Sequence, residues 1–218
     1  IKVSRSCVRR VSNTADTTKG TSPTRWRSRS TSDNSCRATR RCAPGGIGPG
    51  ATVRQDTWEW TGTTWVQITP ATQLNFTQQV RLVWSPQRGQ VLAVTGDNTW
   101  NGPPMKIWGW TGTNWTLINA NGPISRADAY EIAWDSQRGV LVMFGTPFSA
   151  ETWEWNGTVW AQRGTGGPLP RSGHRMVYDA ARHVVVLHGG VNQSGQSFND
   201  TWEGNGVYWL DRFGITAA

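Results

Sequence analysis

Four pairs of tryptophans recur along the chain, and in each pair the second tryptophan follows the first by seven residues. The pairs are Trp58/Trp65, Trp108/Trp115, Trp153/Trp160 and Trp202/Trp209, and they start 50, 45 and 49 residues apart. Self-similarity at a period of roughly 20 to 50 residues is typical of solenoids, propellers and other repeat arrays. One structural unit is therefore repeated in tandem, which limits the fold more than overall composition does.

Each tryptophan pair brackets a turn signal, which is Thr-Gly in two units and Asn-Gly in the other two. Asn-Gly tolerates positive φ at both central positions of a type I′ turn, so it is a strong hairpin signal. With a two-residue turn at 156–157, Trp153 would face Trp160 across the hairpin, and the same count applies to the other pairs. We expect these tryptophans to pack between sheets, with Glu59 and Glu154 facing solvent.

A second hairpin precedes each tryptophan hairpin and is clearest over residues 174–190. There the turn Ala180-Ala-Arg-His183 joins two apolar runs, and the second run ends at Gly189-Gly190. The turns after Trp84 and Trp134 mark the same hairpin in two earlier units. Each unit thus reads as four short antiparallel strands, A to D, and strand B is a continuous apolar run typical of a strand buried on both faces. The chain is predicted to be all-β.

A meander of four strands, with Gly-Gly after the second and a tryptophan in the third, resembles the kelch repeat of galactose-oxidase-like β-propellers. Two segments, 56–65 and 151–160, contain the motifs Asp/Glu-Thr-Trp-Glu-Trp and Gly-x-x-Trp and are similar in sequence to bacterial kelch-type proteins. The resemblance has departures, since Asp97 and Thr146 replace the second glycine and Gly204 stands where another unit has Trp60. The last unit has the fullest set of matching positions, namely His174, Tyr178, Asp179, Arg182, Gly189, Gly190, Asp200 and Trp202.

The repeat predicts a β-propeller segment over residues 46–213. It divides into a half blade at 46–70 and complete blades at 74–119, 124–165 and 169–213. Propellers close with about four to eight blades, and the kelch resemblance implies about six or seven blades. Three complete blades and one partial blade therefore predict an incomplete propeller, a fragment whose remaining blades belong to a longer chain or whose open ends self-associate.

Residues 1–45 differ from the rest of the chain in charge and pattern. The first 50 residues hold 11 Lys/Arg and 2 Asp/Glu, which leaves 11 and 12 for the other 168 residues. All three cysteines lie there, and the spacing of Cys36 and Cys42 is not that of a metal site. Gly45-Gly46 are in register with the glycines of the last unit, yet no strand pattern precedes them. We therefore expect the first blade to lack its first two strands.

Three interpretations of this basic segment stay open. The Arg/Ser-rich run at 25–32 suits a nucleic-acid-binding arm, since clustered cations neutralise phosphates. Low hydrophobicity and high charge suit a disordered basic linker. The third is out-of-frame translation, because the codons of residues 41–44, read one nucleotide later, can encode Val-Val-Leu, the residues at 185–187. The nucleotide sequence around the reading frame decides this point.

Irregular loops between the strands are the expected place for binding, because variable loops on a rigid scaffold usually carry it. In an antiparallel meander the B–C and D–A connections emerge at one end of the sheets, and the tight A–B and C–D turns emerge at the other. The B–C loops carry aromatics next to amides, which suits stacking on sugar rings or anchoring of a protein. The candidate binding residues are Trp100, Phe148, Phe198, Asn98, Asn192, Arg126 and Arg171.

Catalytic and metal-binding signatures are weak. The galactose-oxidase resemblance implies a copper centre that includes a tyrosine-linked cysteine, but no repeat contains a cysteine. His174 begins a strand A, where other units have Tyr130 and Val80, so we expect a structural histidine with satisfied nitrogens. No catalytic residue, metal or cofactor is predicted.

These observations favour a non-catalytic propeller scaffold that binds a protein or a glycan through its B–C and D–A loops, in a bacterial extracytoplasmic or secreted protein. Two alternatives stay open. One is a fragment of a galactose-oxidase-like or other carbohydrate-active enzyme, and the other is nucleic-acid binding through the basic arm. No membrane segment is apparent in the sequence.

Overall fold

The computed structural model describes residues 41–47, 53–74, 80–96, 104–123, 129–146, 148–164 and 166–212. For residues 41–47, 53 and 54 it describes the backbone but not the side chains. The basic segment 1–40, with the three interpretations attached to it, lies outside these residues. No helix in the described ranges is long and apolar enough to cross a membrane.

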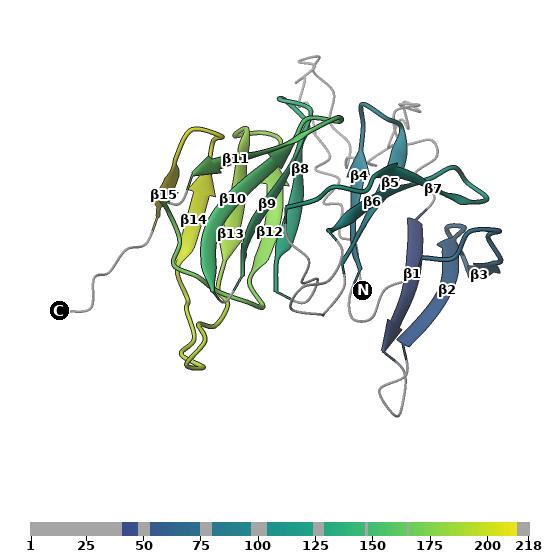
Figure 1. The fold of residues 1–218 in the computed structure, drawn as a ribbon, viewed down its shortest axis with the longest axis horizontal. Coiled ribbons are helices and arrows are strands. Elements are labelled where there is room, and N and C mark those ends of the chain that lie inside the picture. Colours follow the sequence, from purple (N-terminus) through teal and green to yellow (C-terminus); the bar gives the residue numbers. More distant parts are fainter. Residues whose placement is uncertain are drawn as a thin grey trace, which may run out of the picture.

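The strands form four antiparallel sheets in sequence order (Figure 1). The first sheet has three strands, β1 (Arg41–Ile47), β2 (Val53–Trp60) and β3 (Trp65–Ile68). The second contains β4 (Arg81–Ser85), β5 (Gln90–Thr95), β6 (Lys106–Trp110) and β7 (Trp115–Asn119). The third contains β8 (Glu131–Asp135), β9 (Val140–Thr146), β10 (Ser149–Trp155) and β11 (Trp160–Gly164). The fourth contains β12 (Arg175–Asp179), β13 (Val184–His188), β14 (Thr201–Gly204) and β15 (Trp209–Asp211).

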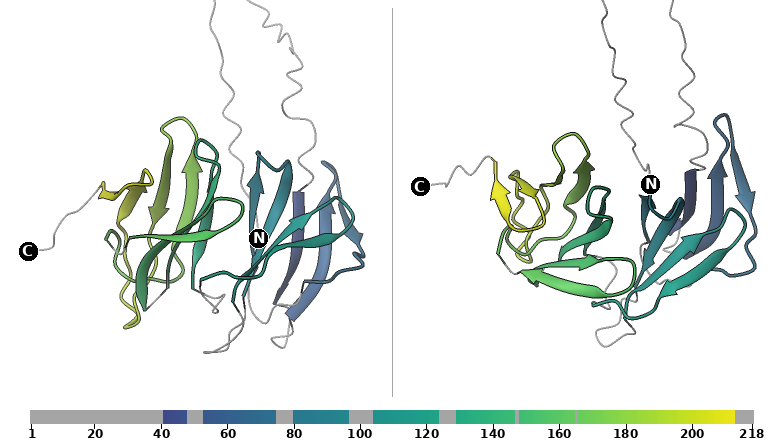
Figure 2. Two further views of the ribbon diagram at one scale, coloured as in Figure 1. Left: turned by 45° about the horizontal axis from the view of Figure 1, so that its top comes forward. Right: turned by 90° about the horizontal axis from the view of Figure 1, so that it is seen from above.

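Each sheet is a simple meander, and the complete sheets contact one another through their first strands, β4 with β8 and β8 with β12. Viewed from above, the four sheets follow one another around an open arc, with the first and last sheets at its two ends (Figure 2). The all-β prediction of propeller blades, three complete and one partial, is confirmed. The arc does not close into a ring.

The second strand of each complete sheet lies in the core, as the continuous apolar runs predict. All seven residues of β9 are buried, because the third sheet has a neighbour on each side. In β13 buried residues alternate with more accessible ones, because the fourth sheet has a described neighbour on one side only. Leu92, Tyr130, Met143 and Trp155 belong to the cluster that fills the space between the second and third sheets.

The predicted register of the tryptophan hairpins is wrong by two residues. Trp155, not Trp153, lies opposite Trp160, and Trp60 likewise lies opposite Trp65. The turn has four residues because its first side chain caps it: the Asn156 carboxamide oxygen accepts hydrogen bonds from the backbone N–H groups of 158 and 159, both at 3.0 Å. Such side-chain-capped turns compete with the tighter two-residue turn.

The expectation that both strands before the first tryptophan pair are missing is also wrong in part. β1 occupies the place of strand B, and Ala43 lies opposite Trp58 as Leu187 lies opposite Trp202. The basic segment was predicted to extend to 45, so the first residues of β1 belong to the sheet instead. Ladder bonds come from the backbone and need no apolar side chains, and Pro44, which has no N–H, lies at a register shift.

Candidate functional site

Three seams join consecutive sheets, and one rule describes how they are built. We call the contact between the first and second sheets the first seam, that between the second and third sheets the second seam, and that between the third and fourth sheets the third seam. In each seam strand C of one sheet, which is β2, β6 or β10, faces two ring positions of the next sheet. These ring positions lie opposite each other across the C–D hairpin, as at Trp110 and Trp115.

The first seam shows the rule in full. The indole Nε1 of Trp110 donates to Glu59 Oε1 at 2.8 Å, and the indole Nε1 of Trp115 donates to Thr57 Oγ1 at 3.1 Å. The two rings lie 4.9 Å apart and are almost completely buried. Glu59 is therefore a buried acceptor between sheets, and its predicted solvent-facing position is wrong.

The second seam lacks both acceptors. Ile107 and Gly109 occupy the positions of the threonine and the glutamate. As a result, the buried indole nitrogens of Trp155 and Trp160 have no hydrogen-bond partner among the described residues. The Arg88 guanidinium lies 5.1 Å from the Trp155 ring centre and gives that ring a cation–π contact instead.

The third seam has both acceptors but lacks one ring. Trp209 donates to Thr152 Oγ1 at 2.9 Å, as the rule predicts. Gly204 stands where a tryptophan would face Glu154, and it lies opposite Trp209 in the ladder. A cavity of about 270 Å³ opens here, which we call the seam pocket. Its lining comprises Arg138, Val142, Thr152, Glu154, Arg163, Gly164, Gly166, Gly167, Val185, Gly204, Gly206, Val207, Tyr208 and Trp209.

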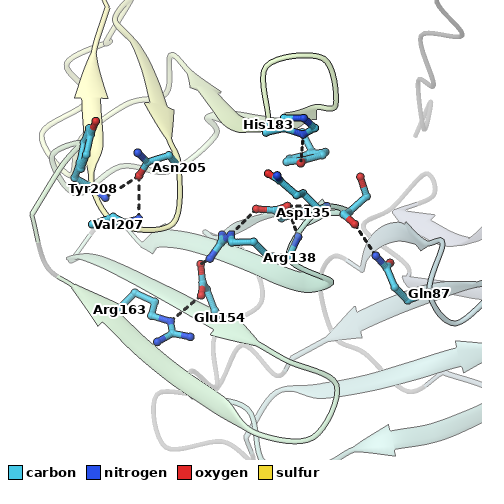
Figure 3. Close-up of polar contacts among 12 residues, drawn as sticks. Gln87, Asp135, Arg138, Glu154, Arg163, His183, Asn205, Val207 and Tyr208 are labelled. Atoms are coloured by element: carbon cyan, nitrogen blue, oxygen red, sulfur yellow. Dashed lines mark hydrogen bonds and ion pairs between the residues drawn. The ribbon is translucent and has the colours of Figure 1, made fainter.

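A buried carboxylate between two arginines is the polar centre of the seam pocket (Figure 3). Glu154 is 2% exposed, so its predicted solvent-facing position is wrong as well. Its oxygens accept from Arg138 Nη1 at 2.6 Å and from Arg163 Nε at 2.7 Å. Burial lowers the pKa of Arg138, but its hydrogen bonds to Asp135 and Glu154 outweigh this and raise that pKa above its usual range. Both guanidiniums keep donors in excess of these bonds.

The C–D turn of the fourth sheet forms the outer part of the pocket. Val207 and Tyr208 are 87% and 60% exposed, and the Asn205 side chain accepts from both of their N–H groups (Figure 3). Gly206 admits the Arg138 side chain, because a Cβ at this position would collide with the guanidinium. The pocket thus combines the indole of Trp209, an acidic acceptor, cationic donors and an accessible tyrosine.

Three of the loop residues predicted to bind a ligand come together at the B–C loop of the fourth sheet. Arg171 is fully buried and forms a bidentate pair with Asp200, at 2.6 and 2.8 Å. Its guanidinium stacks 4.1 Å from the centre of the Phe198 ring. Asn192 holds the loop by accepting from Gln196 N–H at 2.9 Å. Arg171 and Asn192 therefore fix the loop from within.

The loop surface that these residues support is an open hollow of about 560 Å³ lined by Leu169, Pro170, Asn192, Gln193, Ser194 and Phe198. Leu169 is 62% exposed there. Phe148, in the corresponding loop of the third sheet, is 50% exposed. Asn98, Trp100 and Arg126 lie outside the described residues, so their predicted role stays a prediction.

His174 lies beneath the same loop, just before β12. It is 1% exposed, and neither ring nitrogen makes a hydrogen bond of good geometry, so the expected satisfied nitrogens are absent. Burial, with the positive charge of Arg171, lowers the pKa of His174 to about 4. The described ranges contain no cluster of three or more metal-ligating side chains.

Sequence reasoning missed the seam pocket, although one signal was available. Gly204 departs from the repeat, but the structural consequence of this departure depends on Glu154, 50 positions earlier. Only the pairing of adjacent sheets shows that a missing ring in one unit leaves a buried carboxylate of the previous unit without its indole donor.

Comparison with solved structures supports the fold. The chain is similar to YjhT, with a TM-score of 0.55 and 9% identity over 75% of this chain and 53% of that chain. It thus spans about half the length of YjhT. A fucose lectin from Kordia zhangzhouensis, solved with methyl-fucoside, matches with a TM-score of 0.41 and 14% identity, over 61% of this chain and 96% of the lectin. No protein-family model and no curated protein sequence matches the chain. The similarity to YjhT supports the β-propeller-like fold and nothing beyond the fold.

Proposed function

We propose that the chain is a non-catalytic carbohydrate-binding module of kelch-type propeller architecture, and that it holds a sugar ring in the seam pocket. One observation carries this proposal: the third seam keeps the buried acceptor Glu154 but lacks the ring that fills the equivalent space in the first seam. A ligand ring would occupy the place of the missing tryptophan, against Trp209.

The polar groups of the seam pocket favour a saccharide over a purely aromatic ligand. An indole offers one hydrogen-bond donor, which Glu154 alone would satisfy. Arg138 and Arg163 add several donors around the same cavity, and Tyr208 lines it. Pockets with an apolar wall and a few convergent polar groups are typical of small-molecule sites. The hydroxyls of a sugar ring can use both kinds of polar group, because they donate to the carboxylate and accept from the guanidiniums.

The substitution Gly204→Trp tests this site directly. It restores the tryptophan that the first seam has and removes no polar group. The Trp209 ring, which would lie 3.1 Å from the new Cβ, must shift slightly as the added ring fills the pocket. We expect saturation-transfer NMR to detect binding of at least one methyl glycoside, from a panel of the common hexoses and deoxyhexoses, to the unchanged protein. Gly204→Trp should abolish this signal. Glu154→Gln should lower the affinity for the glycoside at least about tenfold, which is roughly 1.4 kcal/mol of binding free energy.

Leu117→Trp is the matched control, because it adds the same side chain at a position that is 50% exposed and lies outside the pocket lining. It should bind as the unchanged protein does. Binding that survives Gly204→Trp, or no binding by any glycoside of the panel, would contradict the proposal.

The loop surface is a second candidate, because Leu169 and Phe148 expose large apolar area beside the B–C loops. This surface would bind a protein or a glycan through Phe148 and Phe198, together with the predicted Trp100. Alanine at Trp100 and Phe198 should then abolish partner capture and leave glycoside binding in the seam pocket unchanged. The opposite result, with binding lost in Gly204→Trp only, assigns recognition to the seam.

A further inference from the structure

The last sheet ends the arc with the same two acceptors that other sheets use toward their next neighbour. Thr201 and Glu203 correspond to Thr57 and Glu59 of the first sheet. Within the chain, Glu203 pairs with Arg182 and with Arg212, and Thr201 Oγ1 lies 2.9 Å from His188 Nδ1. A carboxylate has about four acceptor sites, so Glu203 can also accept from an indole.

The first sheet ends the arc with the matching donors. Trp60 and Trp65 correspond to Trp110 and Trp115, and their rings lie 5.5 Å apart in a similar tilted pair. Trp65 is 47% exposed, whereas Trp115 is 1% exposed because the first sheet covers it. The described residues place no sheet against this face of the first sheet.

Apolar side chains surround the acceptors on the terminal face of the last sheet. Val177 lies opposite Val186, which in turn lies opposite Glu203, and Glu203 lies opposite Leu210. Residues paired across a ladder point to the same face, so these four form one row. Val177 is 56% exposed and Leu210 is 42% exposed, which is unusual for the apolar part of a strand ladder.

We propose that the two terminal faces bind each other between two copies of this chain, head to tail. Trp60 would donate to Glu203 of the partner subunit, and Trp65 would donate to Thr201 of the partner subunit. The three internal seams support this pairing. Donors are satisfied where the threonine and glutamate are present and unsatisfied in the second seam, where they are absent.

Two copies would contribute eight sheets, and propellers close with about four to eight blades. A head-to-tail interface forms a closed ring when its rotation closes and an open filament when it does not. With both terminal faces used in each copy, the closed ring leaves neither face exposed. The proposal uses no residue of the seam pocket, so its test is independent of the test of the carbohydrate proposal.

Analytical ultracentrifugation of the 218-residue chain tests this assembly. We expect a species of twice the 24.1 kDa mass of the chain. Trp65→Arg replaces the indole ring of Trp65 on one terminal face with a charged side chain, and Thr201→Arg replaces the hydroxyl acceptor on the other with a bulky cation. Each variant alone should be monomeric, because every interface in its homodimer contains one altered face.

Mixing the two variants is the decisive experiment for the head-to-tail arrangement. The mixed pair has one unaltered interface, formed by Thr201 of the Trp65→Arg chain and Trp65 of the Thr201→Arg chain, so the dimer should reappear, although at a higher concentration. Reappearance also shows that both variants are folded. A monomeric unchanged chain, a dimer that persists in Thr201→Arg, or a mixture that stays monomeric would each overturn the proposal.

Discussion

The first and third seams contain the same two acceptors and differ in one ring. In the first seam, Trp110 fills the space beside Glu59 and is 5% exposed. In the third seam, Gly204 leaves about 270 Å³ beside Glu154, and arginines donate to the carboxylate instead. The missing ring therefore turns a closed structural contact into a cavity, and the two arginines on Glu154 give that cavity the chemistry of a binding site.

The comparison also shows where the repeat tolerates change. The fourth sheet keeps its place without the ring because Trp209 still bonds to Thr152 and packs 5.5 Å from Phe144. Within the fourth blade, Arg171 and Asp200 form an ion pair that fixes the loop end of the sheet. A site can thus arise within the repeat where a neighbouring contact carries the stability.

Removing the ring from the first seam should have the largest effect. Trp110→Ala opens a cavity beside Glu59 and removes the indole that donates to this carboxylate. We expect a loss of about 3 to 5 kcal/mol in the free energy of unfolding, measured by urea denaturation. Leu117→Ala, at an exposed position of the same sheet, should cost far less. Equal losses would show that the ring is not what stabilises the first seam.

Breaking the Arg171–Asp200 pair inside the fourth blade should have the next largest effect. Arg171→Met leaves Asp200, whose side chain is 23% exposed, without its bidentate partner. We expect a loss of about 2 to 3 kcal/mol in the free energy of unfolding, measured by urea denaturation, which is less than for a fully buried pair. Adding Asp200→Leu to this variant should recover part of the loss, because no charge is then left unpaired. A double variant that is less stable than Arg171→Met would contradict this account of the pair.

The pH dependence of stability should reveal His174. Its pKa of about 4 in the folded chain lies below the ordinary value of 6.5, so the unfolded chain takes up a proton first as the pH falls. Stability is therefore lost as the pH falls from about 6.5 toward 4, by about 2 kcal/mol at pH 5 relative to neutral pH.

His174→Phe should remove this part of the pH dependence, since phenylalanine does not titrate. Urea denaturation at pH 7.5 and pH 5 measures both proteins. His183→Phe is the control, because His183 lies in a turn outside the core. An unchanged pH dependence in His174→Phe would show that another group is responsible.

Exchanging acceptors between the first and second seams should give the smallest effect. Thr57→Val leaves the Trp115 indole without an acceptor and should cost about 1 to 2 kcal/mol. Ile107→Thr supplies an acceptor at the position that corresponds to Thr57, where Trp160 has none. It should therefore cost less than about 1 kcal/mol, although it buries a hydroxyl in place of a methyl group. Differential scanning calorimetry of the two variants measures the difference, and a larger loss in Ile107→Thr would refute the rule.

The sequence predicts the strands and the repeat well, because alternation and turn residues act over a few positions. The tryptophan hairpin fails by two residues, since a side-chain cap at Thr61 or Asn156 lengthens the turn and no periodicity encodes this. β1 was missed because backbone pairing carries it through a basic, proline-containing segment. The seam pocket depends on Gly204 and Glu154 meeting across two sheets, which no local pattern specifies.

The second seam holds its two sheets together without the indole bonds of the other seams. Its two buried indole nitrogens find no acceptor among the described residues. However, the Trp134 indole of the third sheet donates to Gln87 of the second sheet at 2.6 Å, and Gln87 donates to the Ser136 carbonyl at 2.7 Å. Arg81 and Glu131 form an ion pair between the same two sheets. Such redundant contacts allow the repeat to lose both indole bonds at one joint while the adjacent sheets stay attached.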